Sequence, residues 1–148
     1  MENLTMNQAK KRLKFISECI LILLAVSFVK SILEIFLTDV TIDDVSESLI
    51  ITSKIIICLL FTVIIFIPQL YIGVRGLKIA KNPNSSKSHI VWAVIFAGFA
   101  ILLIISAIVG MVNTGDIERN IFGIVNGGID LAMYSCYIVF AKQVFDEV

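Results

Sequence analysis

Histidine is nearly absent from this chain, and that scarcity limits the chemistry it can perform. His89 is the only one, whereas a metal centre needs several His, Cys, Asp or Glu ligands close together. The same scarcity leaves serine and cysteine without a base to activate them as nucleophiles. The glycines of residues 73–76 follow an expected helix rather than a strand, so they do not indicate a phosphate-binding loop. We therefore expect no metal and no other cofactor, and nothing in the sequence indicates an enzyme.

Cysteine is also scarce, and its placement argues against a disulfide framework. Cys19, Cys58 and Cys136 all lie in apolar segments, and this odd number contains no CxxC pair. Cysteine in such a segment behaves as a small apolar residue, which is the role we expect here. Strongly basic runs are missing as well, so we expect no nucleic-acid partner.

Charged residues are also scarce, and apolar residues are correspondingly abundant. The charged fraction is 16% and the hydrophobic fraction is 58%, whereas soluble domains have roughly 25% and 45–50%. A chain of 148 residues is normally one domain. A soluble domain of this size leaves too much surface in water to bury so many apolar side chains. Lipid is the solvent that fits the composition, and the bilayer is the first partner we expect.

Four apolar segments are long enough to cross that bilayer, because a spanning α-helix needs about 20 residues. Polar or turn-forming connections separate them. The first segment is too long for the apolar part of a signal peptide, so we expect it to remain in the mature protein. The sequence predicts an all-α integral membrane protein, a four-helix bundle of two helical hairpins in one domain, residues 1–148. An N-terminal segment, 1–14, precedes spans at about 15–38, 49–74, 90–112 and 121–141.

The basic residues are sorted to one side of these spans, which predicts the orientation. The first connection has no Lys or Arg and the third has only Arg119. Basic loops remain in the cytoplasm, so we expect a multi-pass protein of a bacterial plasma membrane with both termini cytoplasmic. Tyr71, Trp92, Tyr137 and a solvated His89 are then expected near the cytoplasmic interface. The basic residues that share this side are Lys10, Lys11, Arg12, Lys14, Arg75, Lys78, Lys81, Lys87 and Lys142.

Two spans carry a stripe of polar or small residues at helical spacing, which places each set on one face. We expect the two stripes to face each other or a shared cavity, although glycines at this spacing also allow close helix packing. In the second span, Pro68 removes the hydrogen bond to the Ile64 carbonyl, and we expect a bend there. The first stripe is Ser27, Lys30, Ser31 and Glu34, and the second is Gly123, Asn126, Gly127, Asp130 and Tyr134.

Four charged residues lie at membrane depth, where each costs roughly 2.5–3.5 kcal/mol on insertion scales. A rise of about 1.5 Å per residue places Glu34 about 5 Å, Lys54 about 8 Å, Lys30 about 10 Å and Asp130 about 13 Å from the outer boundary. We expect Glu34 to pair with Lys54, and Lys30 with Asp130. In the alternative, Lys54 and Glu34 reach the headgroups and Lys30 pairs with Glu34 alone.

Two interpretations of this polar set remain open, a structural network and a cavity for an ion, a proton or a polar solute. The second predicts a transporter or channel subunit, as a homo-oligomer or with a membrane-protein partner. The alternative function is a non-catalytic accessory, immunity or assembly protein that binds another membrane protein. The candidate residues for a polar network or solute site are Lys30, Glu34, Lys54, Asn126 and Asp130.

Overall fold

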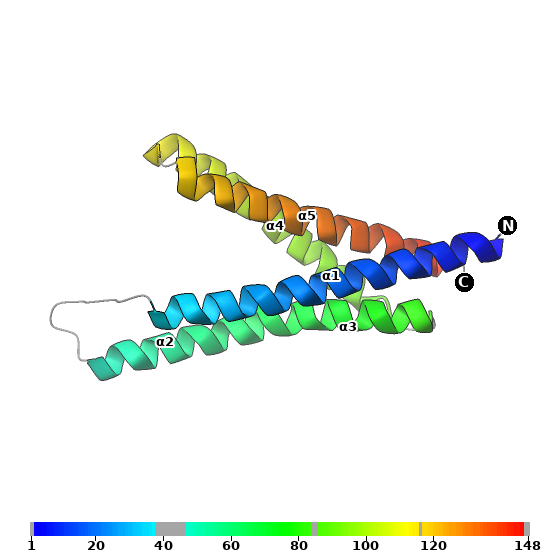
Figure 1. The fold of residues 1–148 in the computed structure, drawn as a ribbon, viewed down its shortest axis with the longest axis horizontal. Helices are drawn as coiled ribbons and strands as arrows, with labels where there is room; N and C mark the ends of the chain where they lie inside the picture. Colours follow the sequence, from blue (N-terminus) through cyan, green and yellow to red (C-terminus); the bar gives the residue numbers. More distant parts are fainter. Residues whose placement is uncertain (1, 38–46, 84–85, 116, 147–148) are drawn as a thin grey trace.

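The computed structural model of the protein describes residues 2–37, 47–83, 86–115 and 117–146 (Figure 1). Residues 2–5, 47, 48, 118 and 119 are described by their backbone alone. The described chain is all-helical. Its elements are α1 (Glu2–Leu37), α2 (Glu47–Phe61), the π-helical turn η1 (Thr62–Phe66), α3 (Ile67–Lys81), α4 (Ser88–Thr114) and α5 (Ile117–Asp146).

Because α2, η1 and α3 follow one another without a break, the elements form four helical rods. Each rod is long and apolar enough to cross a membrane, over Met6–Leu37, Leu49–Lys81, Ser88–Thr114 and Asn120–Asp146. The predicted spans are therefore helices, although each helix extends beyond its predicted span. The predicted first span ends at residue 38, which lies outside the described residues. The N-terminal segment continues as helix into the first span, with Ala9 and Leu13 buried in the core.

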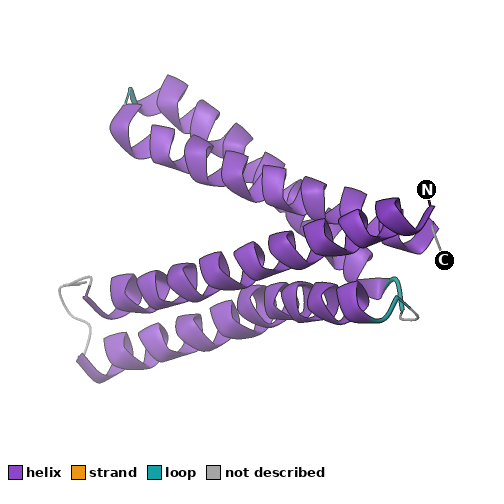
Figure 2. Ribbon diagram, turned by 45° about the vertical axis from the view of Figure 1, so that its right-hand side comes forward, coloured by secondary structure: helices purple, strands orange, loops and turns teal. Residues whose placement is uncertain are grey.

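The rods pack as two hairpins that meet at one end of the molecule. α1 packs against α3, and α4 packs against α5. The pairs converge near the two termini and diverge toward the other end (Figures 1 and 2). The hydrophobic core therefore gathers on the terminal side of the molecule, with α1, α3, α4 and α5 all contributing. Its buried residues are Ala9, Leu13, Ile20, Ile72, Ile79, Ala93, Phe96, Tyr134, Tyr137, Ala141 and Val144.

Glycine lets the first hairpin close tightly. A Cβ at Gly76 would meet the Ser17 hydroxyl on α1 and would lie 2.7 Å from Cε2 of Tyr137 on α5. A Cβ at Gly73 would lie 2.6 Å from the Leu21 side chain. Three helices therefore approach one another here more closely than any larger residue permits. Ser17, in turn, donates from its hydroxyl to the Leu13 carbonyl at 2.7 Å.

The second hairpin also closes on glycines. A Cβ at Gly123 would lie 3.1 Å from the Ala107 Cβ, and one at Gly127 would lie 2.8 Å from Cγ1 of Ile104. Both glycines thus lie against α4. The turn between the helices uses Gly115, whose φ of 69° is in the left-handed region that favours glycine. Its N–H caps α4 by donating to the Met111 carbonyl at 3.1 Å.

Pro68 is accommodated by the π-helical turn that precedes it. The Ile67 N–H donates to the Thr62 carbonyl, which is the wider bonding pattern of a π-helix. This shift lies immediately before the ring nitrogen of Pro68, which has no hydrogen to donate. The Thr62 hydroxyl supplies a further bond to the Cys58 carbonyl at 2.8 Å. The helix continues through the proline into α3, and the change of register sets which α3 side chains face the other hairpin.

Two residues expected at a wet interface are buried instead. His89 is 0% exposed, with Nδ1 3.0 Å from the Ser86 carbonyl and its ring between Tyr137 and Phe145, each 5.8 Å away between ring centroids. The expectation of a solvated His89 is therefore wrong, because these α5 rings cover it. Tyr137 is also 0% exposed and donates to the Ile72 carbonyl at 3.1 Å. It joins the two hairpins rather than facing lipid headgroups.

Candidate functional site

Two cavities lie where the hairpins begin to diverge. The central cavity has a volume of about 240 Å³ and is lined from all four rods. The lateral cavity, of about 480 Å³, lies between η1 and α3 on one side and α4 and α5 on the other. They adjoin, because both are lined by Ile65, Gln69, Leu103, Asp130 and Tyr134. We call the two together the cleft.

Asp130 brings a carboxylate to both cavities from the middle of α5. The residue is partly buried, and no ion pair or hydrogen bond to the carboxylate is found among the described residues. Tyr134, one turn further along α5, is buried and its ring stacks on Phe96 with centroids 5.7 Å apart. This stacking holds the tyrosine against α4 beside the carboxylate.

Gln69 contributes the polar side chain of the second rod to both cavities. It directly follows Pro68 and the π-helical turn of residues 62–66. The stripes of the first and fourth spans predicted where polar side chains would face, but Gln69 was missed. A lone glutamine in an apolar run has no periodic partner, and the only signal was its position next to the proline. Ser106 of α4, which lines the lateral cavity, was missed for the same reason.

The first helix lines the central cavity with hydroxyls and aromatic carbon. Ser27 and Ser31 of the predicted stripe lie there, together with Phe28. Phe28 packs on Phe66 with ring centroids 4.2 Å apart, and on Phe61 with centroids 6.4 Å apart. The cleft thus combines few polar groups with many apolar and aromatic ones.

The two charged residues of the first stripe, Lys30 and Glu34, do not line the cleft. Lys30 Nζ lies 3.6 Å from Glu34 Oε1, and the two side chains are 67% and 63% exposed. The expected pair of Lys30 with Asp130 is therefore wrong, and the alternative pair with Glu34, one turn away on the same helix, is the one that the structure has. The Lys54 ammonium donates to the Phe36 carbonyl at 3.4 Å. Its pairing with Glu34 stays a prediction.

Asn126 also lies outside the cleft. It is exposed on α5, whereas Gly127 next to it is buried against α4. Of the described residues predicted for a polar network or solute site, only Asp130 lines the cleft. No group of three His, Cys, Asp or Glu side chains that could hold a metal ion occurs in the part of the chain that the structure describes.

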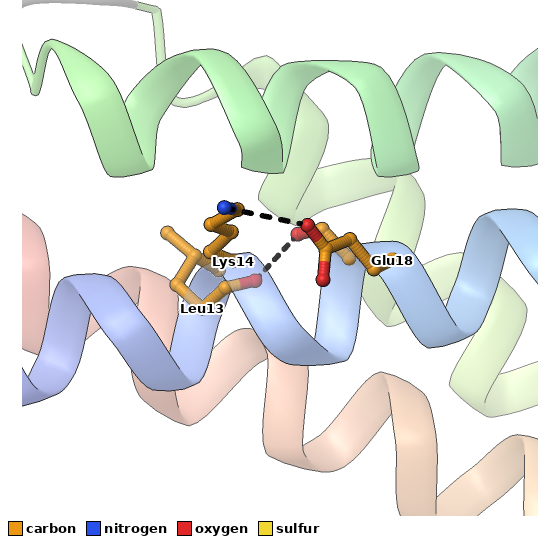
Figure 3. A network of polar contacts seen from close by, with 4 residues as sticks. Leu13, Lys14 and Glu18 are labelled. Carbon is orange, nitrogen blue, oxygen red and sulfur yellow. Dashed lines mark hydrogen bonds and ion pairs between the residues drawn. The ribbon is translucent and has the colours of Figure 1, made fainter.

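The end of the molecule that carries the termini is basic and forms local pairs. Lys14 Nζ lies 3.6 Å from Glu18 Oε1, one turn along α1 (Figure 3). Arg75 Nε donates to the Tyr71 hydroxyl at 3.5 Å, and that hydroxyl lies 2.7 Å from the Ser88 Oγ. These contacts connect α3 to the start of α4 and lie apart from the cleft.

Comparison with known protein families, with curated proteins and with solved structures finds no similar protein.

Proposed function

We propose that this chain is a multi-pass membrane protein that moves an ion or small solute through the cleft, as a transporter or channel subunit. The observation that supports this most is the position of Asp130. It places a carboxylate in a cavity reached by all four rods, in the middle of a helix apolar enough to span a membrane. An ionisable side chain is costly at that depth, and such residues commonly mark ion and solute pathways.

The proposed orientation places the converging, basic end in the cytoplasm. The termini lie at this end (Figure 1), as do the basic residues near the start of α1, in α3 and near the end of α5. Lys30 of α1 and Arg119 of α5 belong to the other end. Positively charged segments are retained on the cytoplasmic side of a membrane. In that orientation the cleft opens toward the outer half of the bilayer, and the cytoplasmic half is closed by the hydrophobic core.

Purified protein in liposomes tests the proposal. Currents on a solid-supported membrane are recorded after concentration jumps of inorganic salts and of protonated amines. The wild type should give a current with at least one cation, and Asp130→Asn should abolish it. Glu18→Gln is the matched control, because it neutralises an exposed carboxylate outside the cleft. A wild type that gives no current with any cation, or an Asp130→Asn variant with full current, contradicts the proposal.

A further inference from the structure

We propose that the cleft binds a lipophilic organic monocation, with the Asp130 carboxylate as its counter-charge. This inference rests on the proposed function and narrows its substrate to one chemical class. The charge of the cleft, the chemistry of its walls and the exposure of its rim each support it.

Among its described residues, the cleft carries one charged side chain, the Asp130 carboxylate, whose single negative charge matches a ligand with one positive charge. Asp130 is the only Asp, Glu, Lys, Arg or His among the described residues that line either cavity. In a medium of low dielectric constant, net charge is penalised, so a lone carboxylate favours a partner that neutralises it. Divalent cations normally gather several carboxylates and other oxygen ligands. A single carboxylate among neutral groups therefore favours a monovalent cation.

The walls favour an organic cation over an inorganic one. The oxygen-bearing side chains of the cleft are few and spread over four rods, so they are poorly placed to replace the hydration shell of a small ion. The lateral cavity is bounded instead by Ile64, Ile65, Phe99, Leu102 and Leu103. Its volume of about 480 Å³ falls within the roughly 300–1,000 Å³ of cavities that hold drug-sized ligands.

Aromatic rings line the same cavities as the Asp130 carboxylate. Tyr134, whose ring stacks on Phe96, lines both cavities with Asp130, and Phe28 lines the central cavity. The face of an aromatic ring attracts a cation, and the attraction strengthens where water is excluded. Apolar groups on the ligand would contact the aliphatic wall while its charge lies near the rings and the carboxylate.

The rim of the lateral cavity lies on the membrane-facing surface of the bundle. Phe99 is 55% exposed and Leu102 is 61% exposed, and both line the cavity from α4. In a bilayer these side chains contact acyl chains. A lipophilic cation partitions into that layer and has a direct route to Asp130 from the side.

Two ions of matched size and shape, tetraphenylphosphonium and tetraphenylborate, provide the test because they differ in the sign of their charge. Binding to the full-length protein in detergent is measured by equilibrium dialysis. The wild type should bind the cation and not the anion. Asp130→Asn should weaken binding of the cation by about tenfold or more, because it removes the counter-charge and keeps the shape. Glu18→Gln should bind as the wild type does.

A second variant keeps the test informative if Asp130→Asn does not fold. Leu102→Trp reduces the lateral cavity and leaves Asp130 in place, so it should also weaken binding of the cation. Equal binding of the two ions, or unchanged binding in every folded variant, overturns the inference. A current of inorganic cations that depends on Asp130, without tetraphenylphosphonium binding, overturns the inference and leaves the proposed function standing. Binding of the cation but not the anion, without any current, supports the inference and contradicts the proposed function.

Discussion

At the scale of single residues, Gly76 determines how closely three helices approach. Glycine inside a helix is unfavourable by roughly 0.5–1 kcal/mol relative to alanine, so its presence needs a structural reason. At Gly76 the reason is steric, because a Cβ would meet both Ser17 and Tyr137. A Cβ added at Gly128 on α5 would meet no atom within 4 Å. The two positions therefore respond differently to the same substitution.

Gly76→Ala should destabilise the protein by about 1–3 kcal/mol, because the added methyl group overpacks the contact between the hairpins. Gly128→Ala should be neutral or should stabilise by up to about 1 kcal/mol, because it improves helix propensity in open space. Thermal unfolding of both variants in the same detergent measures the difference. A Gly76→Ala variant as stable as Gly128→Ala would mean that the hairpins do not meet at this point.

The residue scale also shows which charged positions were predictable. Of the two stripes predicted from helical spacing, Ser27, Ser31, Asp130 and Tyr134 line the central cavity, whereas Lys30, Glu34 and Asn126 do not. Spacing on one helix does not report how far apart two helices lie at each depth. The pairing of Lys30 with Asp130 was therefore wrong, whereas the alternative pairing with Glu34, 3.6 Å away on the same helix, is the one observed. The distance between facing helices at each depth depends on how the helices pack, and a single sequence does not contain that distance directly.

At the scale of elements, the second rod combines a π-helical turn and a proline at the depth of the cleft. π-Helical turns are rare and recur at functional sites because they redirect the side chains that follow. Here the residue that follows Pro68 is Gln69, which lines both cavities. The sequence predicted a bend at Pro68 from its missing N–H and did not predict the π-helical turn of residues 62–66. That Gln69 lines the same cavities as Asp130 depends on how this rod packs against the other helices.

Pro68→Ala should restore an N–H donor and allow a regular helix through residues 62–69. We expect stability to be kept or raised by up to about 1 kcal/mol, with slower amide hydrogen exchange at Ile67 and Gln69. Gln69 should turn away from the cleft, so binding of tetraphenylphosphonium should weaken. Pro83→Ala, beyond the end of α3, is the control and should leave both exchange and binding unchanged. If Pro68→Ala binds the cation as the wild type does, the π-helical turn has no part in the cleft.

At the scale of the whole molecule, the four long apolar segments predicted the number of rods, and the polar connections between them predicted roughly where each rod begins and ends. Each predicted span lies within a helix, apart from residue 38, which lies outside the described residues. The helices are longer than the predicted spans, because polar and charged residues beyond the end of an apolar segment can continue the same helix. The divergence of the hairpins was not predictable, since it depends on which end gathers the small and aromatic contacts between them.

The proposed orientation is testable with single cysteines in a background that lacks Cys19, Cys58 and Cys136. Asn113 is exposed near the end of α4 on the diverging side, and Asn82 is exposed after α3 on the basic side. An impermeant maleimide should label Asn113→Cys in intact cells and should label Asn82→Cys only after the cells are opened. Labelling of Asn82→Cys from outside would reverse the orientation.

The divergence of the hairpins leads to a last prediction about how the molecule responds to a ligand. Leu37 ends α1 and Val112 lies near the end of α4, so spin labels at these exposed positions report the separation of the hairpins at the open end. Among the described residues, the core that joins the hairpins gathers at the end that carries the termini, so a small rotation at that end gives a large displacement at the open end. Double electron–electron resonance should show a broad distance distribution in the free protein.

Tetraphenylphosphonium should shift that distribution to shorter distances, because a ligand held between Asp130 on α5 and the walls of η1 and α3 contacts both hairpins. A ligand shifts a conformational equilibrium only through contacts that differ between the two states, and the closed state supplies more of them. Asp130→Asn should keep the broad distribution and lose the shift. A label pair at Val112 and Ile117, within the second hairpin, should not respond to the cation in either protein. A narrow, short distance between Leu37 and Val112 without ligand would mean that the open cleft is not the resting state.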